Sequence, residues 1–304
     1  YKRQTLGPLL WDTCLSMVDD LCIASETKQE HRVHVTAVLT ALAQRHHSIK
    51  ASKMHILRKI IEYLGHMSTP SGTQPTSKHI DAIVNMPPPL GDDGLVDRSK
   101  LRSLIGMVKF DRRYIPKCGL LCDPLNQLLC DDANLKWRAV HRMVLARIKD
   151  HLAYTKGVYH ADFSKPLYIC CDGSKRGIGG YLFQKVDGQE RVISYFSRAT
   201  TRDERKWDTR ELEVLALIST LEYFRHYIDG QDVYVDTDHQ NITWLSKLRG
   251  RSDRLGRWVL RLSEFRAKIA WRKGKYMDIA DCMSRNSQLS QIDEDCAPAA
   301  AMCH

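Results

Sequence analysis

The sequence lacks the features that mark several protein classes. No apolar run approaches the ~20 residues that span a membrane, and no signal-peptide pattern is visible. The ten cysteines include no Cys-x-x-Cys pair, which argues against a zinc site and against a disulfide framework. Acidic residues number 36 against 46 basic ones, so the formal charge is +10. We therefore expect a protein that is not secreted, has no membrane partner and is suited by its mild basic excess to a polyanion.

The length and composition are sufficient for more than one folded domain. A chain of 304 residues corresponds to roughly two domains, and a hydrophobic content of 43% supports real cores. The chain begins at Tyr1, without a Met and in the middle of a pattern. We interpret it as a fragment of a longer polypeptide.

Two adjacent acids dominate the first 75 residues. Asp19 and Asp20 stand between two apolar runs, which predicts a hairpin with carboxylates at its turn. An ordinary solvated turn explains the same pattern equally well. A helix is predicted over 27–44, whereas the periodicity of 53–65 is ambiguous between a helix and a second hairpin. Residues 69–75, rich in Pro, Gly, Ser and Thr, predict a break.

The middle of the chain predicts helices. The 101–116 stretch has apolar residues on one side and basic residues on the other, including Arg112 and Arg113. Such a face is more often a solvated helix surface than a binding site. Further helices are predicted over 78–85 and 137–152.

The last part predicts a mixed α/β sheet with helices packed on it. Asp172 comes directly after an apolar strand and before a Gly-rich turn, a suitable place for a cation ligand. The expected strands are 167–171, 181–184, 192–196, 233–237 and 267–271; the expected helices are 205–227, 240–248, 255–265 and 278–285.

Several short sequences resemble the reverse transcriptase and ribonuclease H of gypsy-like long-terminal-repeat retrotransposons. Met-Val-Asp-Asp at 17–20, Tyr-Leu-Gly-His at 63–66 and the 101–116 stretch resemble the palm and thumb. The family usually has Tyr at the position of Met17. Asp-Gly-Ser at 172–174, Glu-Val-Leu-Ala at 213–216, Thr-Asp-His at 237–239 and Ile-Ala-Asp at 279–281 resemble the ribonuclease H motifs in their usual order. The implied division is partial palm 1–75, thumb and connection 76–160, ribonuclease H-like domain 161–286 and disordered tail 287–304.

The resemblance implies a site for two Mg²⁺ ions, with Mn²⁺ as a substitute, held by Asp172, Glu213, Asp238 and Asp281. Each of the last three has a rival. Glu211 has capping-box spacing from Asp208, Asp236 lies on the same strand face as Asp238, and Asp278 precedes Asp281 near the helix start. Glu213 is preferred because it stands among apolar residues, where an acid is costly unless it is paired or metal-bound.

In the palm, Asp19 and Asp20 would bind metal by the same resemblance. The family's third polymerase acid and its fingers precede this hairpin, in the missing N-terminal part of the polyprotein. Two-metal phosphoryl transfer needs every carboxylate. We therefore expect no polymerisation by this chain alone.

The implied activity is Mg²⁺-dependent hydrolysis of the RNA strand of an RNA–DNA hybrid; the alternative is a retroelement relic that binds nucleic acid without cleaving it. The expected location is a cytoplasmic retroelement particle or the nucleus. A basic run that includes Arg251, Arg254 and Arg257 has few acids nearby in sequence, which favours contact with a hybrid backbone. Arg112 and Arg113 would bind primer and template.

Overall fold

The computed structural model describes residues 5–237 and 254–271. The chain forms two compact units, Tyr1–Thr76 and Ser77–His304. Outside the described residues lie these predicted features: Asp238, Arg251, Asp278, Asp281, the helices 240–248 and 278–285, and the tail 287–304.

The first unit begins with the predicted hairpin. β1 (Cys14–Met17) pairs antiparallel with β2 (Asp20–Ile23) in the register Met17 to Asp20, so Val18 and Asp19 form the turn. Helix α2 (Lys28–Gln44) follows, and a capping box between Thr27 and Glu30 fixes its start. Val38 and Leu42 of this helix pack with residues of the hairpin in a small core.

A second hairpin resolves the ambiguous stretch. β3 (Ile61–Tyr63) pairs with β4 (His66–Ser68), and β4 pairs with β5 (Gly72–Pro75). Leu64 and Gly65 have φ of 52° and 78°, as a tight hairpin turn requires. The Thr69–Gly72 turn brings the chain back beside β4, where it pairs as β5. The predicted break at 69–75 thus contains a turn and a short strand. The short 3₁₀ turns η1 (Gly7–Leu9) and η2 (Ala51–Lys53) complete this unit.

Helices make up the first part of the second unit. Asp97 caps the start of α4 by accepting hydrogen bonds from two backbone N–H groups. The buried residues of these helices form one core cluster. The elements are α3 (Ser77–Val84), α4 (Arg98–Phe110), η3 (Arg112–Tyr114), α5 (Cys118–Leu121), α6 (Asp123–Gln127) and α7 (Ala139–Ala153).

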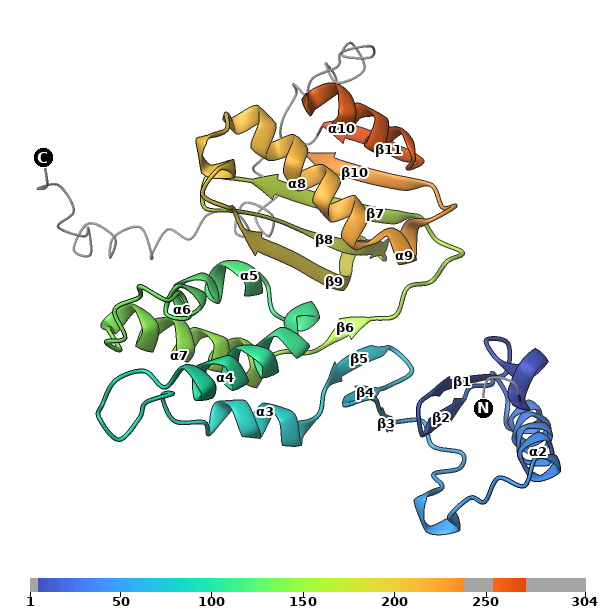
Figure 1. The fold of residues 1–304 in the computed structure, drawn as a ribbon. Helices are drawn as coiled ribbons and strands as arrows, with labels where there is room; N and C mark the ends of the chain where they lie inside the picture. The colour runs from blue at the N-terminus through green and yellow to red at the C-terminus, as the bar shows by residue number, and fades with distance from the viewer. Residues whose placement is uncertain (1–4, 238–253, 272–304) are drawn as a thin grey trace, which may run out of the picture. The chain divides into compact units, whose positions relative to one another are not determined.

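The rest of the second unit is a five-stranded sheet in the order β11-β10-β7-β8-β9 (Figure 1). β10 is parallel to both β7 and β11, whereas β8 is antiparallel to β7 and β9. This is the mixed α/β arrangement expected of the ribonuclease H fold, so the predicted fold class is confirmed. The strands are β7 (Leu167–Gly173), β8 (Gly177–Val186), β9 (Gln189–Ala199), β10 (Val233–Thr237) and β11 (Ala267–Trp271), preceded by β6 (Val158–Tyr159).

The single helix predicted over 205–227 is wrong in its extent. It is divided into η4 (Glu204–Lys206), α8 (Thr209–Tyr223) and α9 (Arg225–Ile228). Trp207 has an extended backbone, and Asp208 then caps a new helix start. A side-chain cap replaces the continuing helical hydrogen bonds at this point.

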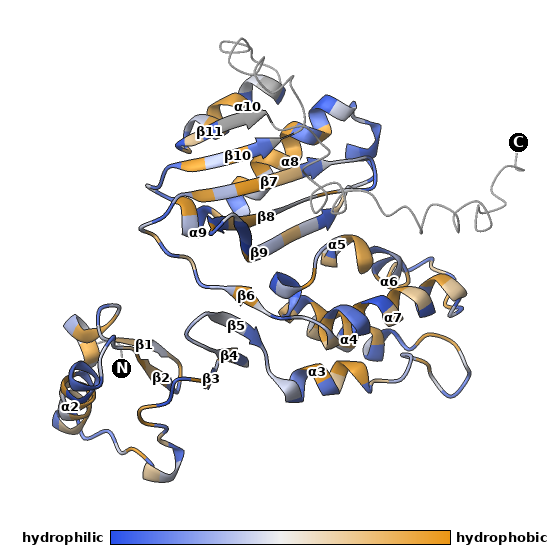
Figure 2. Cartoon of the chain, turned by 180° about the vertical axis from the view of Figure 1, so that it is seen from behind, coloured by the Kyte–Doolittle hydropathy of each residue, from blue (hydrophilic) through white to orange (hydrophobic). Residues whose placement is uncertain are grey.

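The core of this sheet lies under α8, which crosses one face of the strands together with α10 (Arg254–Ser263) (Figure 1). Hydrophobic residues are concentrated on α8 and on the strands beneath it (Figure 2). Two glycines let the helix approach closely, because a methyl group at Gly173 or Gly180 would lie within 3 Å of α8 atoms. Within the described part of the chain, no helix is both long and apolar enough to cross a membrane.

Candidate active site

Asp172 lies one residue before the end of β7. The alternating residues Ile169 and Cys171 belong to the core under α8, so Asp172 belongs to the other face of the strand. It is nevertheless only 8% exposed, and it lies opposite Gly179 of β8. The structure thus has a carboxylate near the strand end, as the sequence predicts, and it also buries that carboxylate.

Gly173 brings the α8 backbone next to Asp172. A methyl group at Gly173 would lie 2.4 Å from the carbonyl oxygen of Leu212 and 3.1 Å from the backbone nitrogen of Glu213. No side chain larger than hydrogen fits there without a backbone shift. Two acids that are distant in sequence, Asp172 and Glu213, are therefore carried by backbone segments in direct contact.

The two acids at the start of α8 have different surroundings. Glu211 completes a capping box with Asp208 and also pairs with Arg254. Glu213 is 6% exposed and lies within the buried part of the helix. Glu211 is thus engaged in holding the helix start, whereas Glu213 is the more buried of the two acids.

β10 ends beside β7. Its register pairs Asp236 with Cys170, so the chain leaves β10 close to the end of β7 that carries Asp172. Asp236 is buried, and its carboxylate lies 3.6 Å from the ammonium nitrogen of Lys185. Asp236, the alternative to Asp238 as a metal ligand, is therefore engaged in an ion pair. Asp238 itself and Asp281 lie outside the described residues.

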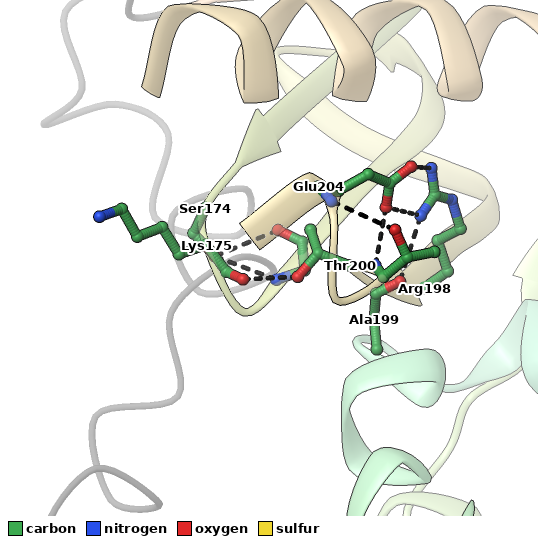
Figure 3. A network of polar contacts seen from close by, with 8 residues as sticks. Ser174, Lys175, Arg198, Ala199, Thr200 and Glu204 are labelled. Atoms are coloured by element: carbon green, nitrogen blue, oxygen red, sulfur yellow. Dashed lines mark hydrogen bonds and ion pairs between the residues drawn. The ribbon is translucent and has the colours of Figure 1, made fainter. Parts of the chain in front are cut away.

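A polar network fixes the turn that follows Asp172 (Figure 3). The Ser174 N–H donates to the carbonyl oxygen of Gly177 at 2.9 Å, and the Thr200 hydroxyl donates to the carbonyl oxygen of Lys175 at 2.5 Å. Arg198 and Glu204 form a bidentate ion pair, with guanidinium nitrogen to carboxylate oxygen distances of 2.7 and 2.8 Å. The hydrogen bond from Arg198 is the main reason that the pKa of Glu204 lies below its ordinary value.

The Asp19–Asp20 pair in the first unit has the opposite environment. Both side chains are exposed, Asp19 in the hairpin turn and Asp20 at the first position of β2. The preceding residue, Val18, has φ of 49°, an unfavourable conformation for a β-branched side chain.

The predicted basic residues divide into engaged and exposed ones. Arg254 pairs with Glu211, and its guanidinium lies 3.9 Å from the centre of the Trp207 ring. The expectation that α10 arginines lack matching acids is therefore wrong for Arg254. Arg261, also on α10, pairs with Glu222. Their acids are on α8, distant in sequence, so a search of sequence neighbours could not find them.

The remaining described arginines differ from one another. Arg257 is exposed on α10. Arg113 donates a hydrogen bond to the Tyr227 hydroxyl at 2.8 Å, and the Arg112 guanidinium lies 5.1 Å from the Tyr223 ring centre. Arg112 and Arg113 thus connect the helical region to the end of α8 and to α9.

The described residues do not form a complete metal site by themselves. Among them there is no group of three or more His, Cys, Asp or Glu side chains that could hold an ion. The donor chemistry of Asp172 and Glu213 nevertheless suits a hard cation such as Mg²⁺, which prefers carboxylate oxygens.

Sequence reasoning missed the residues that support the Asp172 turn. Arg198 lies at the end of β9 and Thr200 directly after it, and Leu120 of α5 lies against Gly177. Only the spacing of Thr201 and Glu204, which resembles a capping box, signals this region in the sequence.

This fold and its buried acids define a ribonuclease H-like α/β domain. Residues 162–265 match the family model described as the RNase H-like domain found in reverse transcriptase.

The chain as a whole is similar to the reverse transcriptase region of retrotransposon polyproteins. It is 31% identical over 286 residues to the retrovirus-related Pol polyprotein from transposon 297 of Drosophila melanogaster, across 92% of this chain and 26% of that protein. It is 30% identical over 275 residues to the transposon Tf2-3 polyprotein of Schizosaccharomyces pombe, across 88% of this chain. The chain spans about a quarter or less of the length of these relatives, 26% and 20%.

Solved structures of a foamy viral protease-reverse transcriptase share the fold. One, in complex with double-stranded DNA, has a TM-score of 0.74 at 23% identity and covers 89% of this chain and 47% of its own. Another, in complex with an RNA/DNA hybrid, has the same score and identity and covers 89% of this chain and 37% of its own. The α/β region that precedes the ribonuclease H-like domain is included in these matches.

Proposed function

We propose that this chain is part of a gypsy-like retroelement polyprotein and cleaves the RNA strand of an RNA–DNA hybrid in a Mg²⁺-dependent reaction. The observation that carries the proposal is the contact between Gly173 and the α8 backbone, which joins the segments of two buried carboxylates, Asp172 and Glu213. Acids buried to this degree are uncommon in proteins, and buried carboxylates gathered at one place are candidates for a catalytic site. The solved relative in complex with an RNA/DNA hybrid supports the substrate class.

Asp172 and Glu213 are proposed to hold Mg²⁺ together with Asp238 and Asp281. When bound, the two ions would activate a water molecule and stabilise the leaving 3′ oxygen. Burial of Asp172 and Glu213 keeps bulk water from competing for their oxygens and strengthens their field at a bound cation. The Ser174–Gly177 turn, held by Thr200, fixes the backbone next to Asp172 and thereby its orientation.

The domain division 1–75, 76–160, 161–286 and 287–304 remains part of the proposal. In the first part, Asp19 and Asp20 are proposed as polymerase metal ligands that need the upstream polyprotein segment. Their exposure in the hairpin suits acids that await further ligands.

A cleavage assay tests the proposal. The purified chain is incubated with an RNA–DNA hybrid labelled on each strand, with Mg²⁺ or with a chelator. We expect cleavage of the RNA strand alone, with 5′ phosphate ends. Asp172→Asn should lower the rate at least about 100-fold, because metal binding contributes several kcal/mol to such reactions. Binding of the hybrid without cleavage in any metal would favour the non-catalytic alternative.

A further inference from the structure

The helical region contacts the sheet at β9, whose end pairs with Gly177, the residue that closes the turn after Asp172. The backbone N–H of Gly119, in α5, donates to the Ser197 hydroxyl of β9 at 2.9 Å. A methyl group at Gly119 would lie 2.3 Å from the carbonyl oxygen of Ser197. α5 and β9 therefore meet backbone to backbone, which permits little relative movement.

Leu120 extends this contact to the turn itself. Its side chain is 7% exposed, yet among the described residues it is not part of the helical core cluster that includes its neighbour Leu121. One methyl carbon of Leu120 lies 2.3 Å from the position that a methyl group on Gly177 would occupy. The burial of Leu120 is thus supplied in part by Gly177, at the start of β8.

Gly177 is also the residue that closes the turn after Asp172. It accepts hydrogen bonds from the N–H and the hydroxyl of Ser174 at 2.9 and 3.1 Å. Thr200, which directly follows β9, donates a hydrogen bond from its hydroxyl to the carbonyl oxygen of Lys175 in the same turn. α5 therefore contacts both β8, at Gly177, and β9, at Ser197. Figure 3 shows the turn beside the end of β9.

We propose that Gly119 and Leu120 are positioning residues for the Asp172 turn, so that the helical region is needed for the full cleavage rate. The proposal rests on the proposed ribonuclease H function for its consequence in catalysis. Its structural part, that α5 holds the turn in place, stands on the contacts of Gly119, Leu120 and Gly177.

Hydrogen exchange tests the structural part without any need for activity. In the full chain, Leu120→Ala is compared with Leu128→Ala, which removes the same atoms from a buried site in the helical core, and with the conservative Leu120→Met. We expect Leu120→Ala to speed exchange of the 174 and 177 amides at least about tenfold relative to Leu128→Ala, with Leu120→Met close to wild type. Ser197→Ala, which removes only the hydrogen bond to Gly119, provides a milder second variant with the same direction of effect.

Equal exchange at these amides in Leu120→Ala and Leu128→Ala, and no change in Ser197→Ala, would overturn the proposal. Activity gives the second readout: Leu120→Ala should lower kcat for the hybrid at least about tenfold with little change in KM, since small misplacements of catalytic groups reduce rate more than binding. If wild type cleaves nothing while the exchange result holds, the ribonuclease H proposal fails and the positioning contact remains.

Discussion

The chain carries two pairs of acids that differ in burial. Asp19 and Asp20 are exposed on a two-stranded hairpin, whereas Asp172 and Glu213 are 8% and 6% exposed where a strand meets a helix. An exposed pair is solvated as ions and needs no further structure. A buried pair is costly to keep ionised unless it is paired, hydrogen-bonded or metal-bound. Asp172 and Glu213 therefore depend on the folded sheet and on α8 for their environment, whereas Asp19 and Asp20 need only a hairpin.

The largest effect is expected from comparing variants of the two acids at the start of α8, Glu211 and Glu213. Glu213→Gln should lower hybrid cleavage about 100-fold or more, because it removes a proposed metal ligand. Glu211→Ala should change cleavage less than about threefold and instead lower the free energy of unfolding by about 1 kcal/mol, because it removes the capping-box contact with Asp208 and the ion pair with Arg254. Rates and urea unfolding of both variants decide the matter, and the reverse pattern would assign the site to Glu211.

The close approach at Gly173 gives the next effect. Gly173→Ala forces a methyl group against the Leu212 carbonyl and should lower the free energy of unfolding by about 1–3 kcal/mol. Gly106→Ala is the matched control, since nothing lies within 4 Å of a methyl group there and Gly106 is inside α4. That control should stabilise by about 0.5–1 kcal/mol. Similar unfolding curves for both variants would show that α8 does not press on this strand end.

The arginines of α10 should differ in how they respond to salt. Arg257→Ala should weaken hybrid binding and reduce the slope of log affinity against log salt by about 1, as expected for a single lost phosphate contact. Arg254→Ala should leave the slope unchanged and cost about 0.5–1 kcal/mol of stability, because its guanidinium stacks on Trp207 and pairs with Glu211. Binding measured at several salt concentrations separates them, and an unchanged slope for Arg257→Ala removes it from the interface.

The smallest effect is expected at acid pH. The pKa of Glu204 is lower in the folded chain than in the unfolded one, chiefly through the hydrogen bond from Arg198. Its stabilising contribution is therefore complete above the ordinary Glu pKa of about 4.3 and is lost as the pH falls through the lower folded value. Glu204→Gln should reduce stability at pH 7 and flatten the decline below about pH 4. Parallel stability curves for the variant and the wild type would show that the Arg198 pair contributes nothing.

Local patterns predicted much of the fold. The Asp208–Glu211 spacing predicted the capping box of α8, and the apolar run before Asp172 predicted β7 and the position of its acid. The break in the predicted 205–227 helix was missed because its periodicity continues through Trp207, although the cap at Asp208 was present in the sequence. Boundaries depend on such caps more than on periodicity.

Long-range contacts could not be predicted from these patterns. The acid partner of Arg254 comes from a different helix, and the fit of Leu120 against Gly177 joins residues of the helical region and the sheet. In the sequence, Gly173 looks like an ordinary turn residue after Asp172. In the structure, its missing side chain allows the α8 backbone to approach closely. Packing of this kind depends on the assembled fold and leaves no periodic signal.

The most direct test of the buried site is a titration with Mn²⁺ followed by electron paramagnetic resonance. Mn²⁺ takes the carboxylate ligands that Mg²⁺ prefers and is visible in this measurement. We predict that the wild type and the double variant Asp19→Asn/Asp20→Asn bind Mn²⁺ equally at this site. The single variants Asp172→Asn and Glu213→Gln should each lose that bound Mn²⁺. Unchanged Mn²⁺ binding in Asp172→Asn and Glu213→Gln would contradict the assignment of these two buried acids to one cation site.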